Sequence, residues 1–116
     1  MKYPRKIYAI KHEKSNRIYI GSSNDVENRI KSHLYALRCG KHTNKHMQSD
    51  FNNLGEYYKF YILDDISSRE ELHKEYQWQL KYKSKDPKYG YNDKDKGGSG
   101  KKIKFEEELP TIDDSL

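Results

Sequence analysis

Apolar residues make up only 33% of this 116-residue chain, so any folded core must be small and must draw heavily on aromatic side chains. Eleven residues are tyrosines, and 35% of the chain is charged. One domain of ordinary size is therefore the most that the sequence can build. The single cysteine, Cys39, excludes an internal disulfide and zinc sites built on several thiols.

The net charge of +5 is unevenly distributed along the chain. Residues 1–104 carry every Lys and Arg and sum to +10, whereas residues 105–116 carry only acids and sum to −5. A basic body favours a polyanionic partner, and nucleic acid ranks ahead of a lipid surface because no basic amphipathic anchor is evident. Charge that serves only solubility is the alternative. No apolar run has the length of a membrane span or signal peptide, so we expect a cytoplasmic protein.

Two short runs of β-branched and aromatic residues, 6–10 and 17–20, predict a β-hairpin near the start of the chain. The two-residue period of a strand places Tyr19 and Gly21 on one face of the second run. We expect the strand to end at Gly21, and two tyrosines, Tyr8 and Tyr19, to lie in paired strands.

A helix is expected next, because Asn24 and Glu27 have the spacing of a capping box. Gly40 is a plausible end for it. Arg29 and His33 are four residues apart and would project together from the edge of the buried face. The apolar stripe of this helix consists of Val26, Ile30, Leu34 and Leu37.

The rest of the chain predicts one more strand and two more helices. Residues 43–53 favour a helix that ends at Gly55, residues 57–63 a strand, and residues 68–82 another helix. Residues 83–104 are rich in Lys, Asp, Gly and Tyr, which is typical of a loop followed by a flexible linker.

His42 and His46 have the four-residue spacing with which two histidines on a helix can bind zinc. The metalloprotease form of this motif needs a glutamate directly after the first histidine, and Thr43 stands there. No second pair of Cys or His completes a structural zinc site. The spacing therefore does not favour a zinc protein.

The sequence also holds the residue types that phosphodiester cleavage requires, namely a base, a cation for the charged transition state and a metal-binding carboxylate. Glu75 could hold one Mg²⁺, because this ion keeps most of its waters and often uses few protein ligands. Arg29 could fork onto phosphate oxygens. The candidates are Tyr8, Tyr19, Arg29, His33, His42 and Glu75. Taken singly, each of them is more often an ordinary core or surface residue.

The order of these residues resembles the GIY-YIG nuclease family. Lys6-Ile7-Tyr8 is followed after ten residues by Tyr19-Ile20-Gly21, and Arg29, His33, Glu75 and Asn92 follow at suitable distances. The stretches 40–44, 47–52, 75–78 and 90–92 resemble its branch of intron-encoded and free-standing phage homing endonucleases. The resemblance covers about residues 5–93, which is most of the chain.

The resemblance implies an α/β (α+β) fold, a three-stranded antiparallel sheet flanked by helices. It implies a nuclease domain over residues 1–93, with residues 94–116 as a basic, Gly-containing linker and acidic tail. The expected activity is hydrolysis of one DNA strand per active site, with one Mg²⁺ or Mn²⁺ ion in each site. We expect DNA as the partner, no membrane, and a monomer or a DNA-induced dimer.

Residue by residue, the resemblance implies that Tyr8 acts as the general base or helps to position it. It implies that Tyr19 orders water or contacts the phosphate. Arg29 would stabilise the phosphate and Glu75 would bind the metal. The accessory and substrate-binding positions are His33, His42, Lys6, Gly21 and Asn92. Gly21 would allow close backbone approach, whereas Lys6 replaces the first glycine of the motif and would change DNA contact near the cleft.

Three alternatives for function remain open from the sequence. A free-standing phage-type endonuclease is the main hypothesis, a dimeric restriction-type nuclease of the same fold is the second, and a nucleic-acid-binding module that does not cut is the third. From the residues that follow the nuclease domain, we expect little room for a separate DNA-recognition region. Lysines in residues 81–104 could grip phosphates, and a solvated linker is the alternative for this stretch. The acidic tail could mimic DNA and screen the basic face, so deleting residues 105–116 should tighten DNA binding at low salt.

Overall fold

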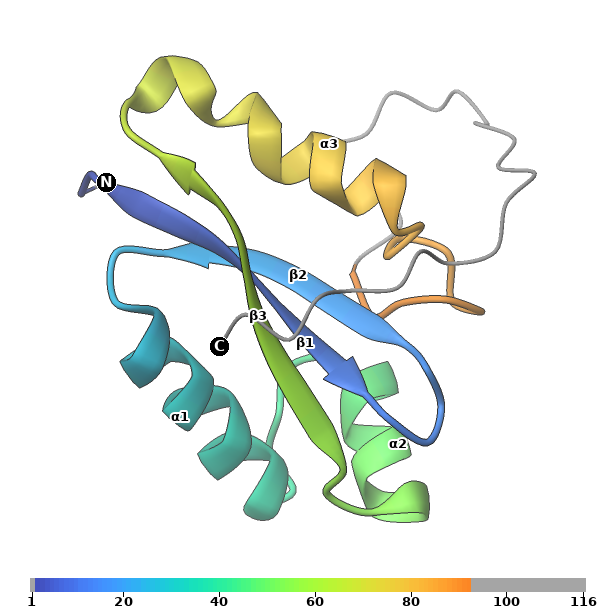
Figure 1. Ribbon diagram of the computed structural model, residues 1–116. Helices are drawn as coiled ribbons and strands as arrows, with labels where there is room; N and C mark the ends of the chain where they lie inside the picture. Colours follow the sequence, from blue (N-terminus) through green and yellow to red (C-terminus); the bar gives the residue numbers. More distant parts are fainter. Residues whose placement is uncertain (1, 93–116) are drawn as a thin grey trace.

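The computed structural model describes residues 2–92, in which three antiparallel strands form one sheet with α-helices on both faces (Figure 1). The strand order is β2-β1-β3, so the first strand of the chain is central. This confirms the predicted fold class. In chain order the elements are β1 (Arg5–His12), β2 (Ile18–Ser23), α1 (Val26–Arg38), α2 (Lys45–Leu54), β3 (Tyr58–Ile66), a 3₁₀ turn (Arg69–Glu71) and α3 (His73–Lys81).

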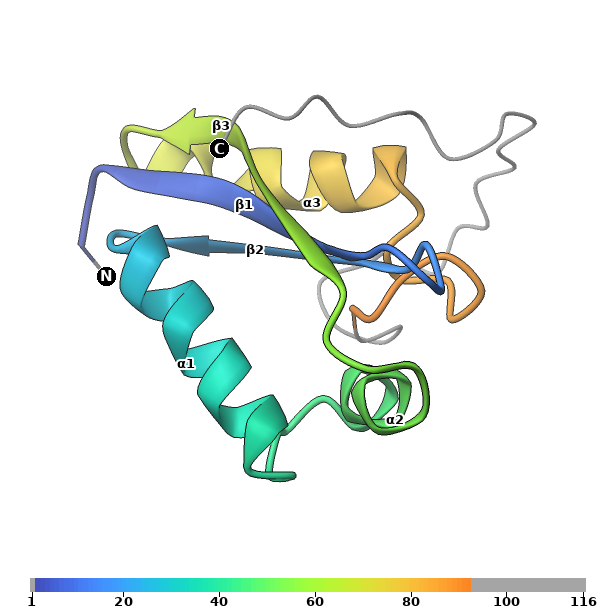
Figure 2. The same cartoon turned by 60° about the horizontal axis from the view of Figure 1, so that its bottom comes forward.

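The sheet separates two small cores. Helices α1 and α2 lie on one face and α3 on the other (Figure 2). Central strand β1 supplies Ile7 and Ala9 to the α3 side, and Tyr8 and Ile10 to the side of α1 and α2. A strand covered on both faces reads as a continuous apolar run, which is how residues 7–10 appear in the sequence.

The predicted alternation along β2 is confirmed, but its predicted end is wrong. Ile18 and Ile20 are buried on the α3 side, while Tyr19 packs on the other face. The ladder with β1 continues through Ser22 and Ser23, so Gly21 lies inside β2. Polar residues can extend a strand because the ladder is made by backbone groups, and sequence patterning does not register this extension.

The start of α1 also differs from the capping box expected at Asn24. The N-cap is Asp25, whose side chain accepts a hydrogen bond from the backbone N–H of Asn28. Within α1, His33 is only 4% exposed rather than partly shielded at the edge. Gly40 has a positive φ of 71°, which suits a residue just beyond a helix end.

The remaining boundaries differ by a few residues from those predicted. Helix α2 begins at Lys45 with Asn44 as its N-cap, and Gly55 ends it with φ of 91°. Strand β3 extends to Ile66. The predicted helix over residues 68–82 divides into the 3₁₀ turn and α3.

Residues 83–92 form no helix or named strand, yet they cover the outer edge of β2. Gly90 makes a parallel bridge with Ile18. The side-chain amide of Asn92 accepts a hydrogen bond from the backbone N–H of Ile20 and donates one to its carbonyl. Backbone groups at a sheet edge need partners, and this segment supplies them. None of the helices in residues 2–92 is long and apolar enough to cross a membrane. The predicted linker and acidic tail, 94–116, lie outside the described residues.

Candidate active site

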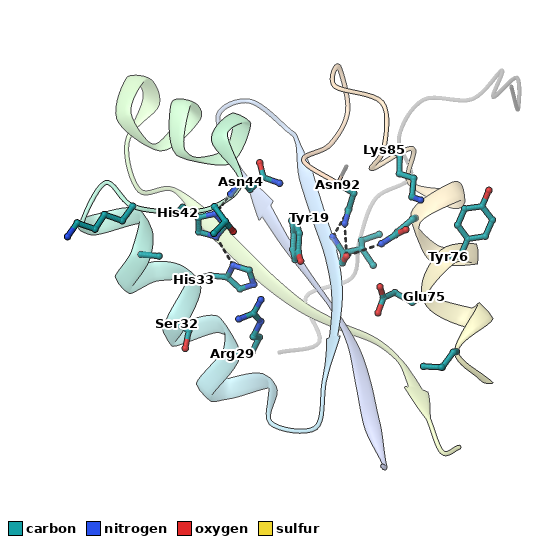
Figure 3. Close-up of a pocket in the computed structure, with 16 residues that line it drawn as sticks. Tyr19, Arg29, Ser32, His33, His42, Asn44, Glu75, Tyr76, Lys85 and Asn92 are labelled. Atoms are coloured by element: carbon teal, nitrogen blue, oxygen red, sulfur yellow. Dashed lines mark hydrogen bonds between the residues drawn. The ribbon is translucent and has the colours of Figure 1, made fainter. Parts of the chain in front are cut away.

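A cavity of about 700 Å³ lies beside edge strand β2, between α1 and α3 (Figure 3). Arg29 and His33 from α1 and His42 from the following loop form one wall, and Glu75 from α3 forms part of the opposite wall. Tyr19 of β2 lies between the two walls, and Asn92 lines the cavity at the covered edge. The fold thus gathers residues from positions 19 to 92 around one space.

Tyr8 lies beneath this cavity rather than on its surface. Its side chain is 1% exposed, and its hydroxyl oxygen is 2.9 Å from Nε2 of His33. Nδ1 of His33 is in turn 2.8 Å from Nε2 of His42. Tyr19 packs close to this chain, with its ring centroid 6.3 Å from that of Tyr8 and 5.1 Å from that of His33.

The direction of the hydrogen bonds in this chain is determined at its far end. The backbone N–H of Asn44 can only donate, and it donates to Nδ1 of His42 at 2.9 Å. Neutral His42 therefore carries its proton on Nε2 and donates it to Nδ1 of His33. His33 then carries its own proton on Nε2 and donates to the oxygen of Tyr8. The hydroxyl of Tyr8 is thus an acceptor in this chain, and its own proton is available to another group.

Burial keeps the three hydrogen-bonded side chains, Tyr8, His33 and His42, uncharged. Desolvation, with further contributions from Arg29 and His42, lowers the pKa of His33 to about 3. Desolvation and Arg29 also lower the pKa of His42. Burial raises the pKa of Tyr8, and the charge and hydrogen bond of Arg29 act in the opposite direction. Arg29 is therefore the group that favours a tyrosinate at this site.

Gly21 is the cross-strand neighbour of Tyr8. A Cβ at this position would lie 2.8 Å from the Tyr8 hydroxyl oxygen and 3.0 Å from a ring carbon of Tyr19. Such contacts are shorter than van der Waals distance, so only glycine leaves room for both rings.

Glu75 is the side chain that fits a metal ion. It points from α3 toward β2, and within the described residues its carboxylate makes no hydrogen bond or ion pair (Figure 3). No group of three or more His, Cys, Asp or Glu able to hold a metal exists among residues 2–92. A single free carboxylate suits Mg²⁺ or Mn²⁺, which would complete their coordination with water and substrate phosphate.

Two of the candidate substrate-binding residues, Asn92 and Lys6, bond strands of the sheet. Asn92 lines the cavity, but the oxygen and the nitrogen of its side-chain amide are both hydrogen-bonded to the backbone of Ile20. It therefore fastens the segment 83–92 to β2. Lys6 does not line the cavity, and its ammonium pairs with Asp65 on β3 at 2.8 Å. The structure therefore does not bring Lys6 to the other candidates.

The histidine pair considered for zinc is not on one helix. His42 precedes α2, whereas His46 lies inside it. Both ring nitrogens of His42 are used, by His33 and by the backbone of Asn44. His42 thus belongs to the hydrogen-bond chain that ends at Tyr8.

Sequence reasoning missed the residues that hold the hydrogen-bonded histidines in place, and it missed many of the residues that line the cavity. Gln48 is 7% exposed, accepts from the backbone N–H of His42, and donates to Leu37 and Asn52. The stretches 40–44 and 47–52 contained the signal, since their family match included Asn44 and Gln48. The other unpredicted cavity residues include Ser32, Lys41, Thr43, Tyr76, Gln79 and Lys85.

This fold and this cavity are those expected of a GIY-YIG nuclease domain. Comparison with known families agrees, because residues 5–92 match the GIY-YIG catalytic domain, and the chain belongs to that family. Among curated proteins it is similar to intron-associated endonuclease 1 of Enterobacteria phage T4, with 36% identity over 66 residues. That match covers 57% of this chain but only 27% of the phage protein. The predicted family, and the prediction of an enzyme, are thus confirmed for the catalytic domain.

Two solved structures have the same fold. The catalytic domain of homing endonuclease I-TevI superimposes with a TM-score of 0.69 and 33% identity, covering 77% of this chain and 97% of that one. A variant of the same catalytic domain gives a TM-score of 0.68 and 33% identity, covering 78% and 93%. The similarity therefore spans almost the whole of the solved domain.

Proposed function

We propose that this protein is a divalent-metal-dependent DNA endonuclease that hydrolyses one strand per active site. The observation that carries the proposal is the position of Arg29 and Glu75 on opposite walls of one cavity, with Tyr19 between them. A cation and a free carboxylate across a polar cavity suit a phosphodiester, because one binds phosphate oxygens and the other binds the metal. Family membership and the net positive charge support the choice of DNA.

In the proposed reaction a water oxygen attacks phosphorus and the bond to the leaving oxygen breaks. Mg²⁺ or Mn²⁺ on Glu75 would neutralise phosphate charge, one ion per site. Arg29 holds the other phosphate oxygens. Tyr8 acts as the tyrosinate, after its own proton has passed to solvent, and takes the proton of the attacking water, while the leaving oxygen takes a proton from solvent water. Hydrogen bonds from His33 and Arg29 prepare the Tyr8 oxygen for that negative charge.

His42 acts through His33. Its Nδ1 accepts from the backbone N–H of Asn44, so it can only present Nε2–H to His33. The tautomer that His33 presents to Tyr8 is therefore set three hydrogen bonds away from the Tyr8 oxygen, at Asn44. Tyr19 contacts the water or the phosphate from the cavity floor. Gly21 and Asn92 maintain the shape of the site rather than bind the substrate.

We propose that a monomer makes each single-strand cut and that DNA recruits a second copy when both strands are cut. Among cellular settings, a phage-infected or bacterial cytoplasm suits this activity. A restriction-type dimer would instead cut at short palindromes, so mapping the cut ends on a phage genome separates the two nuclease hypotheses.

Nicking of supercoiled plasmid tests the proposal. Wild type with Mg²⁺ should convert plasmid to the nicked form, EDTA should abolish the conversion, and Glu75→Gln should slow it at least 100-fold. Glu71→Gln is the matched control, because Glu71 is a nearby carboxylate paired with Lys74 and does not line the cavity. A wild-type protein that binds plasmid but does not nick it in any divalent metal would favour the binding module, and equal nicking by both variants would refute the role of Glu75.

A further inference from the structure

A second, smaller cavity of about 310 Å³ adjoins the main cavity. The two cavities share four lining residues, Thr43, Asn44, Lys85 and Asn92. The smaller cavity, which we call the annex, is completed by Lys45, His46, Pro87, Gly90 and Tyr91. The annex therefore lies between the start of α2 and the segment that covers the edge of β2.

The annex has a chemistry different from that of the main cavity. Among residues 2–92, its lining contains two lysines and a histidine, and no Asp or Glu, whereas the main cavity contains Glu75. Asp50 acts electrostatically on His46 from within α2, but two hydrogen bonds from Arg17 and one from the Tyr91 hydroxyl already engage its carboxylate. Positive side chains thus outnumber negative ones among the described residues that line the annex, and such a cavity suits an anion.

The walls of the annex are held in place before any ligand arrives. The side chain of Asn44 donates to the carbonyl of Tyr91, and the rings of Tyr91 and His46 make a T-shaped contact with their centroids 5.3 Å apart. Asn92 is fastened to Ile20. Such preorganisation lowers the entropy lost on binding.

Lys85 stands at the boundary of the two cavities. Its ammonium lies 4.9 Å from the centroid of the Tyr76 ring, and both side chains line the main cavity (Figure 3). A cation in this position can face ligands in either cavity. Lys45 lines only the annex, and its side chain is exposed.

We propose that the annex binds the phosphate adjacent to the scissile one on the cleaved DNA strand, through Lys45 and Lys85, with His46 as a hydrogen-bond donor. This inference rests on the proposed nuclease function and extends it, because it gives the strand a direction through the protein. From the scissile phosphate between Arg29 and Glu75, the strand continues past Asn44 and Asn92 rather than toward Lys6. The contact is with the backbone and reads no sequence.

The first test measures DNA binding in EDTA, where no cutting occurs. A labelled 30-base-pair duplex is titrated by fluorescence anisotropy with wild type and with the double variant Lys45→Ala/Lys85→Ala over a range of salt concentrations. The slope of log K against log salt should become shallower by about 1 to 2, as expected for losing one or two phosphate contacts. The matched control is Lys31→Ala/Lys74→Ala, which removes the same charge from lysines outside both cavities that pair with Glu27 and Glu71.

An equal change of slope in the two double variants would overturn the annex proposal, because net charge alone would then explain the effect. The outcome does not depend on cleavage, so it can fail or succeed independently of the nuclease assignment. Circular dichroism of both variants should match wild type, since neither pair of lysines is buried.

The second test uses the mapped cut site. Replacing the single phosphate next to the scissile bond with a neutral methylphosphonate, on each side in turn, should slow wild-type cutting about tenfold or more on one side only, as expected for a lost charge-assisted contact. The same replacement should slow Lys45→Ala/Lys85→Ala no further. Equal sensitivity of the wild type and this variant would assign the contact to other residues and refute the annex.

Discussion

The Cβ position of Gly21 points directly at the hydroxyl of Tyr8, its partner across the first two strands. A backbone position thus determines where the proposed base can lie. The same hydroxyl receives the hydrogen bond from His33, so a shift of the ring would also break the histidine chain. The glycine and the tyrosine of the two motifs act as one unit.

Gly21→Ala should therefore damage catalysis more than folding. The added methyl would sit 2.8 Å from the Tyr8 oxygen, and relief by moving the ring should cost about 1–3 kcal/mol of stability. We expect the nicking rate to fall at least tenfold in single-turnover assays, with urea denaturation reporting the stability. Ser22→Ala, the next position on the strand, is the control. Full activity of Gly21→Ala would show that the placement of Tyr8 is not critical.

Acid should destabilise the protein because His33 is neutral in the folded state. Its folded pKa is about 3, below the unfolded value of 6.5, so the unfolded chain binds the extra proton between these two pH values. This contribution to stability is complete above pH 6.5 and decreases as pH falls toward 3, by at most about 1.4 kcal/mol per pH unit. Urea unfolding at pH 7.5, 6 and 5 measures it.

His33→Gln provides the comparison for this pH effect. Because glutamine does not titrate, the variant should lose less stability than wild type between pH 7.5 and 5, although it is less stable at pH 7.5. His42 has the same sign of shift and leaves a residual slope. An unchanged slope in the variant would place the acid sensitivity elsewhere.

The rate of cutting should rise with pH if Tyr8 is the base. Burial raises the pKa of Tyr8 above its ordinary value of 10, so the tyrosinate fraction grows about tenfold per pH unit from pH 6 to 9. Single-turnover nicking at saturating Mg²⁺ should follow that increase. Tyr8→Phe should be at least 100-fold slower and should lose most of the slope. A residual rate in Tyr8→Phe with the wild-type slope would identify another titrating group, such as a metal-bound water.

Gly90→Ala should detach the segment that covers the edge of β2. A Cβ at this position would lie 2.2 Å from backbone atoms of Ser84, which cannot move as a side-chain tip can. Displacing residues 89–92 breaks the bonds between Asn92 and Ile20. Hydrogen exchange should show faster exchange at the Ile20 amide. Lys88→Ala, an exposed substitution in the same loop, should leave that amide protected.

Much of the fold was predictable because its signals are local. The alternation around Tyr19 identified the two faces of β2, and the glycines at 40 and 55 marked helix ends with the positive φ that they adopt. The strand ends were misjudged where Ser22 and Ser23 continue the ladder, since pairing there depends on β1 and not on side-chain type.

The residues of the candidate site could be named from the sequence, but their arrangement could not. Tyr8, Arg29, His33, His42 and Glu75 came from a resemblance in motif order, and four of them line the cavity. Nothing in the sequence indicated that Tyr8 would lie beneath it, or that the histidines would form a chain.

The sequence by itself determined the residue types, the strand and helix periods and the family, because each depends on neighbours along the chain. Only the tertiary structure decided which way protons point and which polar groups are engaged, because those bonds join residues far apart: Tyr8 and His33 are 25 positions apart, and Ile20 and Asn92 are 72 apart. Bonds at such separations form when the sheet and helices pack, so their geometry belongs to the fold as a whole.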